Sequence, residues 1–276
     1  MPAPDYLPLS GISGQGSNGL HSVEIPGGRT IDEIVIEYNY SATAGDEFDP
    51  SHFTAIRLNL NTEDIVDVKG TDLVTVESHK RGSNADGYLV INLADVGAKT
   101  FDGMNLTGLV TFASDAISLE IETTGARATS NDVTLKAFAR YSPARKVRTV
   151  VPKMRRYIYN SPGAGEFEIV NMPRGPRYKG MHFLSSLVDG LKLYVNEVKK
   201  FDQSKARNDM MLTRYGLTPQ TGVFHYSPAA DGYQMAHTLS TKGARSMELK
   251  VKTTGAGAVP VLVEFFDVLD QPPASA

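Results

Sequence analysis

Six histidines are the side chains best able to hold a catalytic metal ion, and their spacing indicates whether they do so. They are His21, His52, His79, His182, His225 and His237. β-Sheet enzymes that use a metal need imidazoles close together on a strand, often two residues apart, so that both rings point to the same side. No two of these histidines are that close in the sequence. We therefore expect them at the surface or at the edge of a core, with no catalytic or metal-binding role.

Other motifs of catalysis and phosphate binding are absent from the sequence. The chain has no cysteine, which excludes a thiolate nucleophile and a cysteine-ligated zinc ion. It contains neither the Gly-x-Ser-x-Gly motif of hydrolases nor a glycine loop that ends in Gly-Lys-Ser or Gly-Lys-Thr. The glycine-rich residues 10–19 follow no predicted strand and precede no predicted helix, which favours a flexible segment. These observations predict that the protein is not an enzyme and binds no cofactor.

An acidic loop supplies the oxygen ligands that calcium prefers. The sequence DEFDP places Asp46, Glu47 and Asp49 there. It lacks the Asp-x-Asp-x-Asp-Gly spacing of a calcium-binding loop. Because clustered acids in loops are ordinarily solvated, we expect no metal ion at this position.

The longest run of one charge sign is basic. From Arg140 to Arg156 the chain has seven arginines and lysines and no acid, and the next carboxylate belongs to Glu166. These cations either contact another subunit, membrane-protein tails or lipid headgroups, where each contributes about 1 kcal/mol, or they lie in a linker and pair with the acids of flanking domains. The candidates for contact with another subunit or the membrane side are Lys153, Arg155 and Arg156.

Overall composition sets limits on the partners. The chain has 276 residues, of which 41% are hydrophobic and 21% charged, and its formal net charge is −3. This near-neutral balance gives no general attraction to nucleic acid, and we expect no sequence-specific nucleic-acid partner. The sequence also shows neither a signal-peptide pattern nor eighteen consecutive apolar residues, so we expect no membrane-spanning segment.

Short strands must position these side chains. Most segments alternate in polarity and are separated by Gly, Pro, Asn and Asp, which is typical of antiparallel strands. The clearest are residues 32–40, 55–61, 87–93, 132–141, 190–196 and 259–268. Helical signals are few, and the best predicts a helix over residues 204–215, with Ser204 as N-cap and Gly216 after its end. The fold should be all-β.

The chain also repeats itself. LEIETTGA at residues 119–126 returns as LKVKTTGA at residues 249–256. Other segments match in the same order: residues 25–36 with 172–183, 55–61 with 190–196, 71–74 with 208–211, and 133–138 with 261–266. In the repeated strand Leu119 and Ile121 point to one face, because strand side chains alternate. The other face carries glutamates in one copy and lysines in the other, which indicates exposure to solvent.

The repeats predict two tandem domains. We place the first at residues 23–141 and the second at residues 167–269, joined by a basic inter-domain linker at 142–166. Residues 1–22 are rich in Pro, Gly and Ser and should form a flexible arm that orders only on contact with neighbouring subunits; residues 270–276 form a tail. Two β domains of this size, each with one short helix between strands, favour eight-stranded jelly rolls.

Several segments resemble a known family. They are KMRRYIYN at 153–160, MPRGPRYKGMHF at 172–183, DGLKLYVN at 189–196, ARNDMMLTRYG at 206–216 and the end of the second domain at 248–269, with a looser match at 106–125. In order and spacing they resemble the double jelly-roll major capsid proteins of tailless, icosahedral, membrane-containing double-stranded DNA bacteriophages, of the corticovirus type.

This resemblance implies a structural subunit of a virion. Three two-domain subunits would place six similar domains around a threefold axis, so that a homotrimer tiles a shell as a hexagonal block. The implied partners are further copies of the chain, a vertex (penton) protein, and viral membrane proteins or lipid headgroups under the shell. The implied location is the virion, after assembly in the host cytoplasm.

Two other functions fit an all-β chain. A phage or surface β-sandwich that recognises a host glycan would present aromatic platforms on its loops, but the chain has no tryptophan and its tyrosines fall mainly in predicted strands. A metal-dependent, cupin-like enzyme is disfavoured by the spacing of the histidines.

Overall fold

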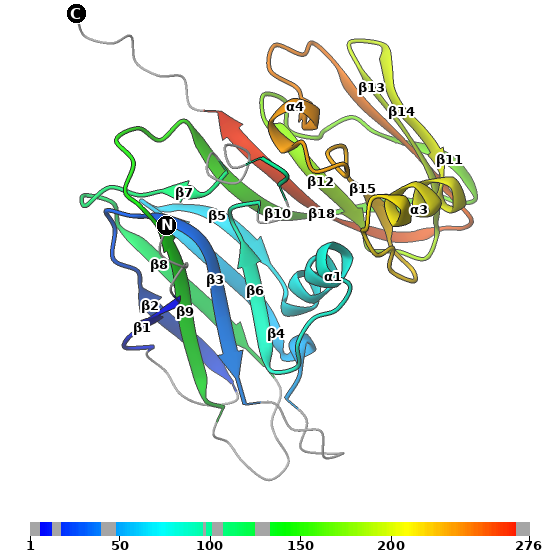
Figure 1. The fold of residues 1–276 in the computed structure, drawn as a ribbon. Helices are drawn as coiled ribbons and strands as arrows, with labels where there is room; N and C mark the ends of the chain where they lie inside the picture. Colours follow the sequence, from blue (N-terminus) through cyan, green and yellow to red (C-terminus); the bar gives the residue numbers. More distant parts are fainter. Residues whose placement is uncertain are drawn as a thin grey trace, which may run out of the picture.

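The computed structural model describes residues 6–12, 18–39, 48–95, 98–100, 107–124 and 133–268. They form two β domains that stand side by side and share one continuous sheet (Figure 1). The helices of the first domain are η1 (Pro50–His52), of the 3-10 type, and α1 (Gly70–Arg81). Its strands are β1 (Tyr6–Leu9), β2 (Gly19–Glu24), β3 (Thr30–Tyr38), β4 (Phe53–Leu60), β5 (Glu63–Val68), β6 (Tyr88–Asn92), β7 (Leu109–Val110), β8 (Ile117–Thr123) and β9 (Leu135–Ser142).

The second domain has helices α3 (Lys205–Arg214) and α4 (Gln234–His237). Its strands are β10 (Val150–Ser161), β11 (Gly165–Ile169), β12 (Arg177–Phe183), β13 (Val188–Val195), β14 (Val198–Ser204), β15 (Phe224–Tyr226), β16 (Leu239–Ser240), β17 (Met247–Thr253) and β18 (Gly257–Val268). The helix predicted at 204–215 is confirmed as α3. None of the helices in the described part of the chain has both the length and the apolar composition that a membrane crossing requires.

Three sheets build the two sandwiches. The first has the order β1-β9-β3-β6, with β7 also paired to β3, and the third has the order β11-β17-β13-β14. The second sheet, β15-β12-β18-β10-β5-β4-β8-β2, crosses from one domain to the other, and β16 pairs with its β12. Each domain therefore encloses its core between one sheet of its own and its part of the shared sheet.

Every strand of the first domain has a counterpart in the second. The orders β1-β9-β3-β6 and β2-β8-β4-β5 recur as β10-β18-β12-β15 and β11-β17-β13-β14. The helices α1 and α3 follow the counterpart strands β5 and β14. The predicted duplication is confirmed as two tandem jelly rolls, each with eight strands and a ninth, β1 or β10, beside β9 or β18.

Corresponding turns also use corresponding contacts. Gly28 and Gly175 adopt φ values of 93° and 114°, in the region where a side chain is strained. The backbone N–H of Gly28 donates to the hydroxyl of Thr111 at 3.0 Å, and that of Gly175 donates to the hydroxyl of Thr241 at 2.9 Å. The predicted match of residues 25–36 with 172–183 thus holds at the level of single hydrogen bonds.

Both domains close one hairpin with the same asparagine. Asn61 joins β4 to β5 and Asn196 joins β13 to β14, with φ values of 54° and 50°. In each turn the next residue also has a positive φ, as a type I′ turn requires. The Asn196 side-chain oxygen accepts from the backbone N–H of Arg245 at 2.6 Å, and the Asn61 oxygen accepts from that of Ala116 at 2.9 Å.

Replacing Asn196 with alanine should therefore destabilise the second domain. The variant loses the side-chain acceptor and places a less tolerant residue at positive φ, which together cost about 1–3 kcal/mol. Asn196→Asp, which keeps an oxygen acceptor and tolerates this conformation, should lose clearly less. Urea unfolding of both variants measures the difference, and equal stabilities would contradict the assigned role.

The match between the last strands is wrong by four residues. Aligning residues 133–138 with 261–266 gives a difference of 128 (261 − 133). In the structure Ser142 and Phe266 lie opposite corresponding residues of β3 and β12, which gives a difference of 124 (266 − 142). Because strand side chains alternate with a period of two, a shift by four leaves every apolar residue on the same face. The hydropathy pattern alone does not distinguish the two registers.

The segments predicted to be a flexible arm and an inter-domain linker form strands instead. The predicted arm, residues 1–22, contains β1 and most of β2, which pair with β9 and β8 of the same chain. The predicted linker, 142–166, contains β10, which pairs with β18 over its whole length. Residues 1–5, 13–17 and 270–276 lie outside the described residues. The hydrogen bonds of these strands come from distant partners, so local composition does not reveal them.

The two domains have separate hydrophobic cores that meet at β18. Val261 and Val263 pack in the core of the second domain, whereas Leu262 between them packs in the core of the first. A strand with partners on both faces needs apolar residues at successive positions, which explains the unbroken run VPVLV. β18 and its neighbour β10 therefore tie the two domains together.

The repeated octapeptide behaves as its pattern predicts. Leu119 and Ile121 of β8 are buried, as are Leu249 and Val251 of β17. Glu122 and Lys252, which occupy corresponding positions on the other face, are both exposed. The charge reversal between the copies thus falls on one exposed pair and on one half-buried pair, Glu120 and Lys250.

Candidate functional site at the domain junction

Polar side chains are buried where the first domain meets the second. Helix α1 lies on the side of the first domain that faces the second (Figure 1). It carries His79 and Lys80 toward β12, β15 and β18, which contribute His182, His225 and Glu264. Both histidines and the glutamate from the second domain are buried, as is His79. A polar junction of this kind must satisfy its hydrogen bonds internally, since burial removes the water.

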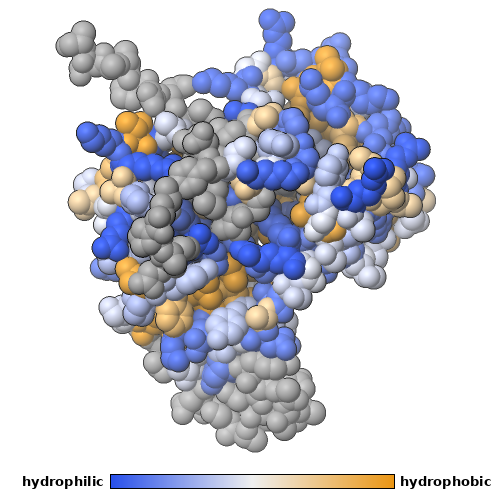
Figure 2. Space-filling model, viewed as in Figure 1, coloured by the Kyte–Doolittle hydropathy of each residue, from blue (hydrophilic) through white to orange (hydrophobic). Residues whose placement is uncertain are grey.

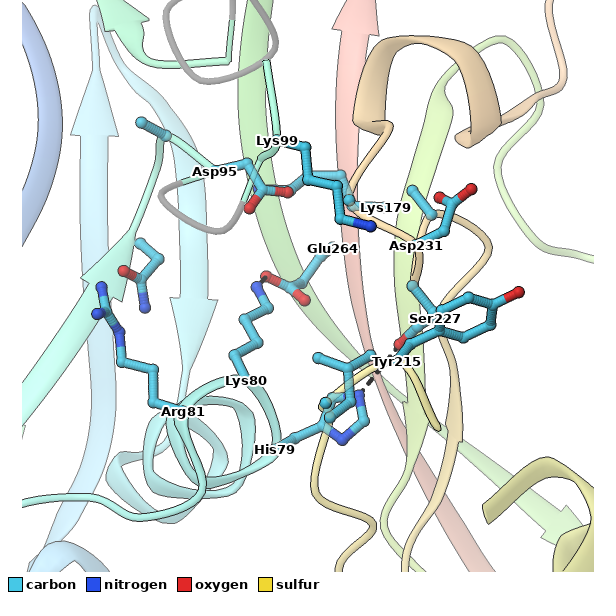
Figure 3. A pocket seen from close by; sticks show the side chains of 17 residues that line it. His79, Lys80, Arg81, Asp95, Lys99, Lys179, Tyr215, Ser227, Asp231 and Glu264 are labelled. Carbon is cyan, nitrogen blue, oxygen red and sulfur yellow. Dashed lines mark hydrogen bonds and ion pairs between the residues drawn. The ribbon is translucent and has the colours of Figure 1, made fainter. Parts of the chain in front are cut away.

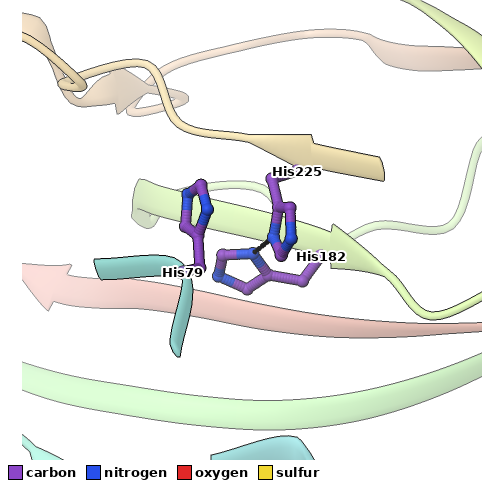
Figure 4. A group of neighbouring side chains, drawn as sticks. All are labelled: His79, His182 and His225. Carbon is purple, nitrogen blue, oxygen red and sulfur yellow. Dashed lines mark hydrogen bonds between the residues drawn. The ribbon is translucent and has the colours of Figure 1, made fainter. Parts of the chain in front are cut away.

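The three histidines form one compact group (Figure 4). The rings of His79 and His225 are stacked, with centroids 3.9 Å apart and an interplanar angle of 5°. The Nδ1 atoms of His182 and His225 lie 2.7 Å apart and share a hydrogen bond. Residues from α1, β12 and β15 thus meet although they are far apart in the sequence.

The partners of the rings define their protonation. His182 Nε2 lies 3.1 Å from the Glu264 carboxylate and donates to it, so its Nδ1 accepts from His225 Nδ1. His225 Nε2 then accepts from the backbone N–H of Gln220 at 3.3 Å. His79 Nδ1 donates to the Thr218 carbonyl at 3.0 Å. These assignments leave the rings of His79 and His225 neutral.

Burial maintains this neutral state. It lowers the pKa of His79 to about 3, because a charged ring there would lose its hydration. Burial also lowers the pKa of His225 far below its ordinary value. Both rings therefore remain uncharged at any pH near neutrality.

The histidine nitrogens approach the spacing of a metal site but not its geometry. One nitrogen from each ring lies within 4.8 Å of the others. Zinc requires nitrogens about 2.0–2.1 Å from one central point, whereas the in-plane lone pairs of the parallel His79 and His225 rings do not converge. A metal would also have to replace the His182–His225 hydrogen bond. The observed arrangement suits a neutral hydrogen-bonded cluster.

The spacing of the histidines in the sequence does not predict this cluster. Two histidines close together on one strand are not found in it, because the three rings come from three separate elements. A weaker signal was present, since His182 and His225 lie within the apolar runs GMHF and VFHY, where a polar residue is buried. Apolar neighbours indicate burial, but they do not identify the partner.

An ion pair joins α1 to β18 beside the histidines. The Lys80 ammonium lies 2.5 Å from the buried carboxylate of Glu264. Although burial alone would favour a neutral acid, Lys80, His182 and Lys179 hold the pKa of Glu264 well below its usual value. Burial likewise opposes the charge of Lys80, but Glu264 and Asp95 raise its pKa. For Lys179, burial and the Lys80 charge lower the pKa.

A cavity of about 270 Å³ opens beside this ion pair (Figure 3). His79, Lys80, Lys179 and Glu264 line it, and its far wall belongs to the loop around Ser227. The Ser227 hydroxyl donates to His79 Nε2 at 3.1 Å, which resembles the nucleophile–base pair of a hydrolase. A histidine with a pKa of about 3 is a poor general base at neutral pH. The hydrogen bond between Ser227 and His79 therefore stabilises the domain junction and is poorly suited to catalysis.

The predicted contact residues lie on β10 and pair within the chain. Lys153 is buried between Glu63 and Asp267. Arg155 lies 3.4 Å from Glu63 and donates to the Asp64 carbonyl at 2.8 Å. The contacts with Glu63 and Asp64 connect β10 to the first domain, whereas the contact with Asp267 lies within the second.

The third predicted residue makes the most enclosed of these contacts. Arg156 pairs with Asp72, which is buried near the start of α1. The backbone N–H of Lys69 also donates to the Asp72 carboxylate, at 3.0 Å. Contact of these three cations with another subunit or a membrane stays a prediction.

The acidic loop lies partly outside the described residues. Asp46 and Glu47 belong to the undescribed part. Asp49 accepts a hydrogen bond from the backbone N–H of Ser51 at 2.7 Å and lies 3.2 Å from the His52 ring. It therefore caps η1, which explains an acid at this position without a metal ion.

Comparisons with known proteins agree with this architecture. The family model described as viral coat protein P2 N-terminal domain matches residues 6–142, and the one described as viral coat protein P2 C-terminal domain matches residues 151–269. A search of curated protein sequences gave no match.

Solved structures with the same fold include viral capsid proteins. The major capsid protein P2 from bacteriophage PM2 is 19% identical, with a TM-score of 0.85 over 98% of this chain and 99% of that one. The STIV MCP is 14% identical, with a TM-score of 0.73 over 99% and 100%. The PBCV-1 virus capsid is 10% identical, with a TM-score of 0.68 over 96% and 93%. At these identities the structural likeness supports the double jelly-roll fold.

Proposed function

The chain belongs to the viral coat protein P2 family, and from this premise we infer that it is a major capsid protein, a structural subunit of a virion rather than an enzyme. The observation that carries the inference is the match of both domains of the family, in order, across nearly the whole chain. The duplicated fold supports it, because the major capsid protein P2 from bacteriophage PM2 shares this fold over 99% of its length. The family match favours this role over the glycan-binding alternative.

The proposed subunit assembles as a homotrimer. Three copies provide six jelly rolls with corresponding strand orders. A threefold ring of these copies therefore has a nearly hexagonal outline where it contacts neighbouring trimers. Such tiles pack into an icosahedral shell. The junction described above supports this role, because its buried ion pair and histidine cluster fix the orientation of the two domains within each tile.

The proposed partners beyond the chain itself are a vertex protein and the membrane under the shell. Arg155 is the most exposed of the three candidate cations, with 38% of its side chain accessible, and is the one best placed to reach a lipid headgroup or a membrane-protein tail. Assembly takes place in the host cytoplasm, where reducing conditions suit a chain without cysteine.

Native mass spectrometry of the purified protein tests the trimer. One chain has a mass of 29.9 kDa, so the expected species is three times that mass, about 90 kDa. Negative-stain images should show hexagonal particles. A monomer or dimer that persists at micromolar concentration would contradict the proposed assembly.

A further inference from the structure

The two domains of one chain are joined by pairing between strands. β5 of the first domain and β10 of the second run parallel, with Val66 opposite Met154 and Asp67 opposite Arg155. Both strands lie at the ends of their own domain's part of the shared sheet. This joint is short and its register is known, so its counterpart elsewhere in the molecule can be identified.

The counterpart of β5 is β14. The hairpins β4–β5 and β13–β14 correspond with a difference of 135 (196 − 61), and their register shifts lie at corresponding places, after Leu58 and after Leu193. Val66 and Asp67 therefore correspond to Phe201 and Asp202. β14 is the last strand of its sheet in the described chain.

The counterpart of β10 is β1. Arg140 of β9 and Glu264 of β18 occupy corresponding positions, opposite Tyr6 and Met154 respectively. The difference is 148 (154 − 6), so Leu7 corresponds to Arg155. β1 pairs with β9 on one side and is the last strand of its sheet among the described residues.

We propose that the joint between β5 and β10 is repeated between subunits, with β14 of one copy pairing in parallel with β1 of the next, Phe201 opposite Tyr6 and Asp202 opposite Leu7. This inference rests on the proposed trimer and specifies its interface. Alternating joints within and between chains form a closed ring of six domains from three copies. Closure also covers two strand edges that would otherwise favour uncontrolled association.

The side chains at the β5–β10 joint and at the proposed β14–β1 joint are of different kinds, but each joint has a matched pair. Within the chain the joint holds an ion pair, Arg155 with Glu63. The corresponding residues are Leu7 and Val198, which are both apolar, so the charged pair is replaced by a hydrophobic one. Val198 is 55% exposed in the single chain. A second copy would bury it.

Helix α3 supports the same interface. It follows β14 as α1 follows β5, and its Met211 is exposed. An open groove of about 690 Å³ is lined by Met211 and by Phe201 of β14, and Figure 2 shows apolar patches on both domains. The second domain thus leaves an open groove beside the strand that we propose pairs with β1.

Cysteine cross-linking tests the register, because the chain has no cysteine of its own. Adjacent strands lie about 4.8 Å apart, within the Cα separation of about 4.4–6.8 Å that a disulfide requires. The double variant Leu7→Cys/Asp202→Cys should form disulfide-linked dimers and trimers under mild oxidation. Asp67→Cys/Arg155→Cys should close a bond within one chain, as a positive control. Leu7→Cys/Glu120→Cys, with the second thiol on β8, should give no cross-link.

The outcomes separate this interface from the proposed function. Trimers that cross-link support the pairing. Trimers that form without a cross-link overturn the pairing and leave the capsid role intact, whereas absence of trimers from the wild-type protein contradicts both. Hydrogen exchange on the wild type gives a second measurement that needs no substitution. The amides of β1 and β14 should exchange at least tenfold more slowly in the trimer than after its dissociation, and equal rates would overturn the pairing.

Discussion

Glu264→Gln should lower the free energy of unfolding by about 3 kcal/mol, because it leaves the ammonium of Lys80 in the junction without its counter-charge. Removal of one partner from a buried ion pair typically costs about 3–5 kcal/mol. The lower end applies here, since 28% of the Lys80 side chain reaches solvent. Glutamine has nearly the same size and still accepts a hydrogen bond from His182, so the effect reports the charge. Urea unfolding followed by fluorescence measures it.

A double-mutant cycle isolates the pair from other effects of the substitution. Lys80→Met/Glu264→Gln removes both charges and should be more stable than the sum of the two single losses predicts, by at least about 1 kcal/mol. Glu37→Gln is the matched control, because the Glu37–Lys136 pair lies at the surface and contributes about 0–1 kcal/mol. If the losses of the two single variants simply add, the ion pair does not hold the junction.

Much of this fold was predictable from the sequence because the protein contains two copies of one plan. Repeated residues such as Asn61 and Asn196 close the same turn, and Gly28 and Gly175 take the same left-handed conformation. Each of these turns requires a particular residue type at one position, and that residue is visible in the sequence. The short strand that carries the octapeptide was equally clear, since its faces alternate.

The junction was not predictable for the opposite reason. β10 carries Lys153, Arg155 and Arg156, and such a basic segment resembles a solvated linker when it is considered alone. Its charges are compatible with a strand only because carboxylates of the first domain meet them. The histidine cluster similarly depends on contacts between distant segments. Sequence periodicity describes one element at a time, whereas these features exist only between elements.

Acid should weaken the protein well before its carboxylates are protonated. His79 has a pKa of about 3 in the folded chain and an ordinary value of about 6.5 once unfolded. Above pH 6.5 neither state holds the proton, and the stability is complete. As the pH falls below 6.5, His79 binds a proton in the unfolded chain but not in the folded chain. The free energy of unfolding therefore decreases progressively down to about pH 3.

The size of the loss follows from the number of buried rings. One such histidine costs about 1.4 kcal/mol for each pH unit. The pKa of His225 is lowered as well, so both rings together should remove about 5 kcal/mol between pH 6.5 and 4.5. Glu264, whose folded pKa lies below its ordinary value, adds a further loss only below about pH 4.5. The groups that face His79 are His182, His225, Lys80 and Glu264.

Melting temperatures measured between pH 8 and 4.5 separate the histidine contribution from the rest. His79→Gln removes one titrating ring, so it should roughly halve the pH slope of stability between 6.5 and 4.5 while lowering stability at pH 8. Asn196→Ala, which lowers stability without changing a titrating group, should keep the wild-type slope. A His79→Gln protein with an unchanged slope would contradict the role of the neutral cluster. The expected slope follows from burying neutral imidazoles between the two domains, because a proton bound there places a charge where water is excluded.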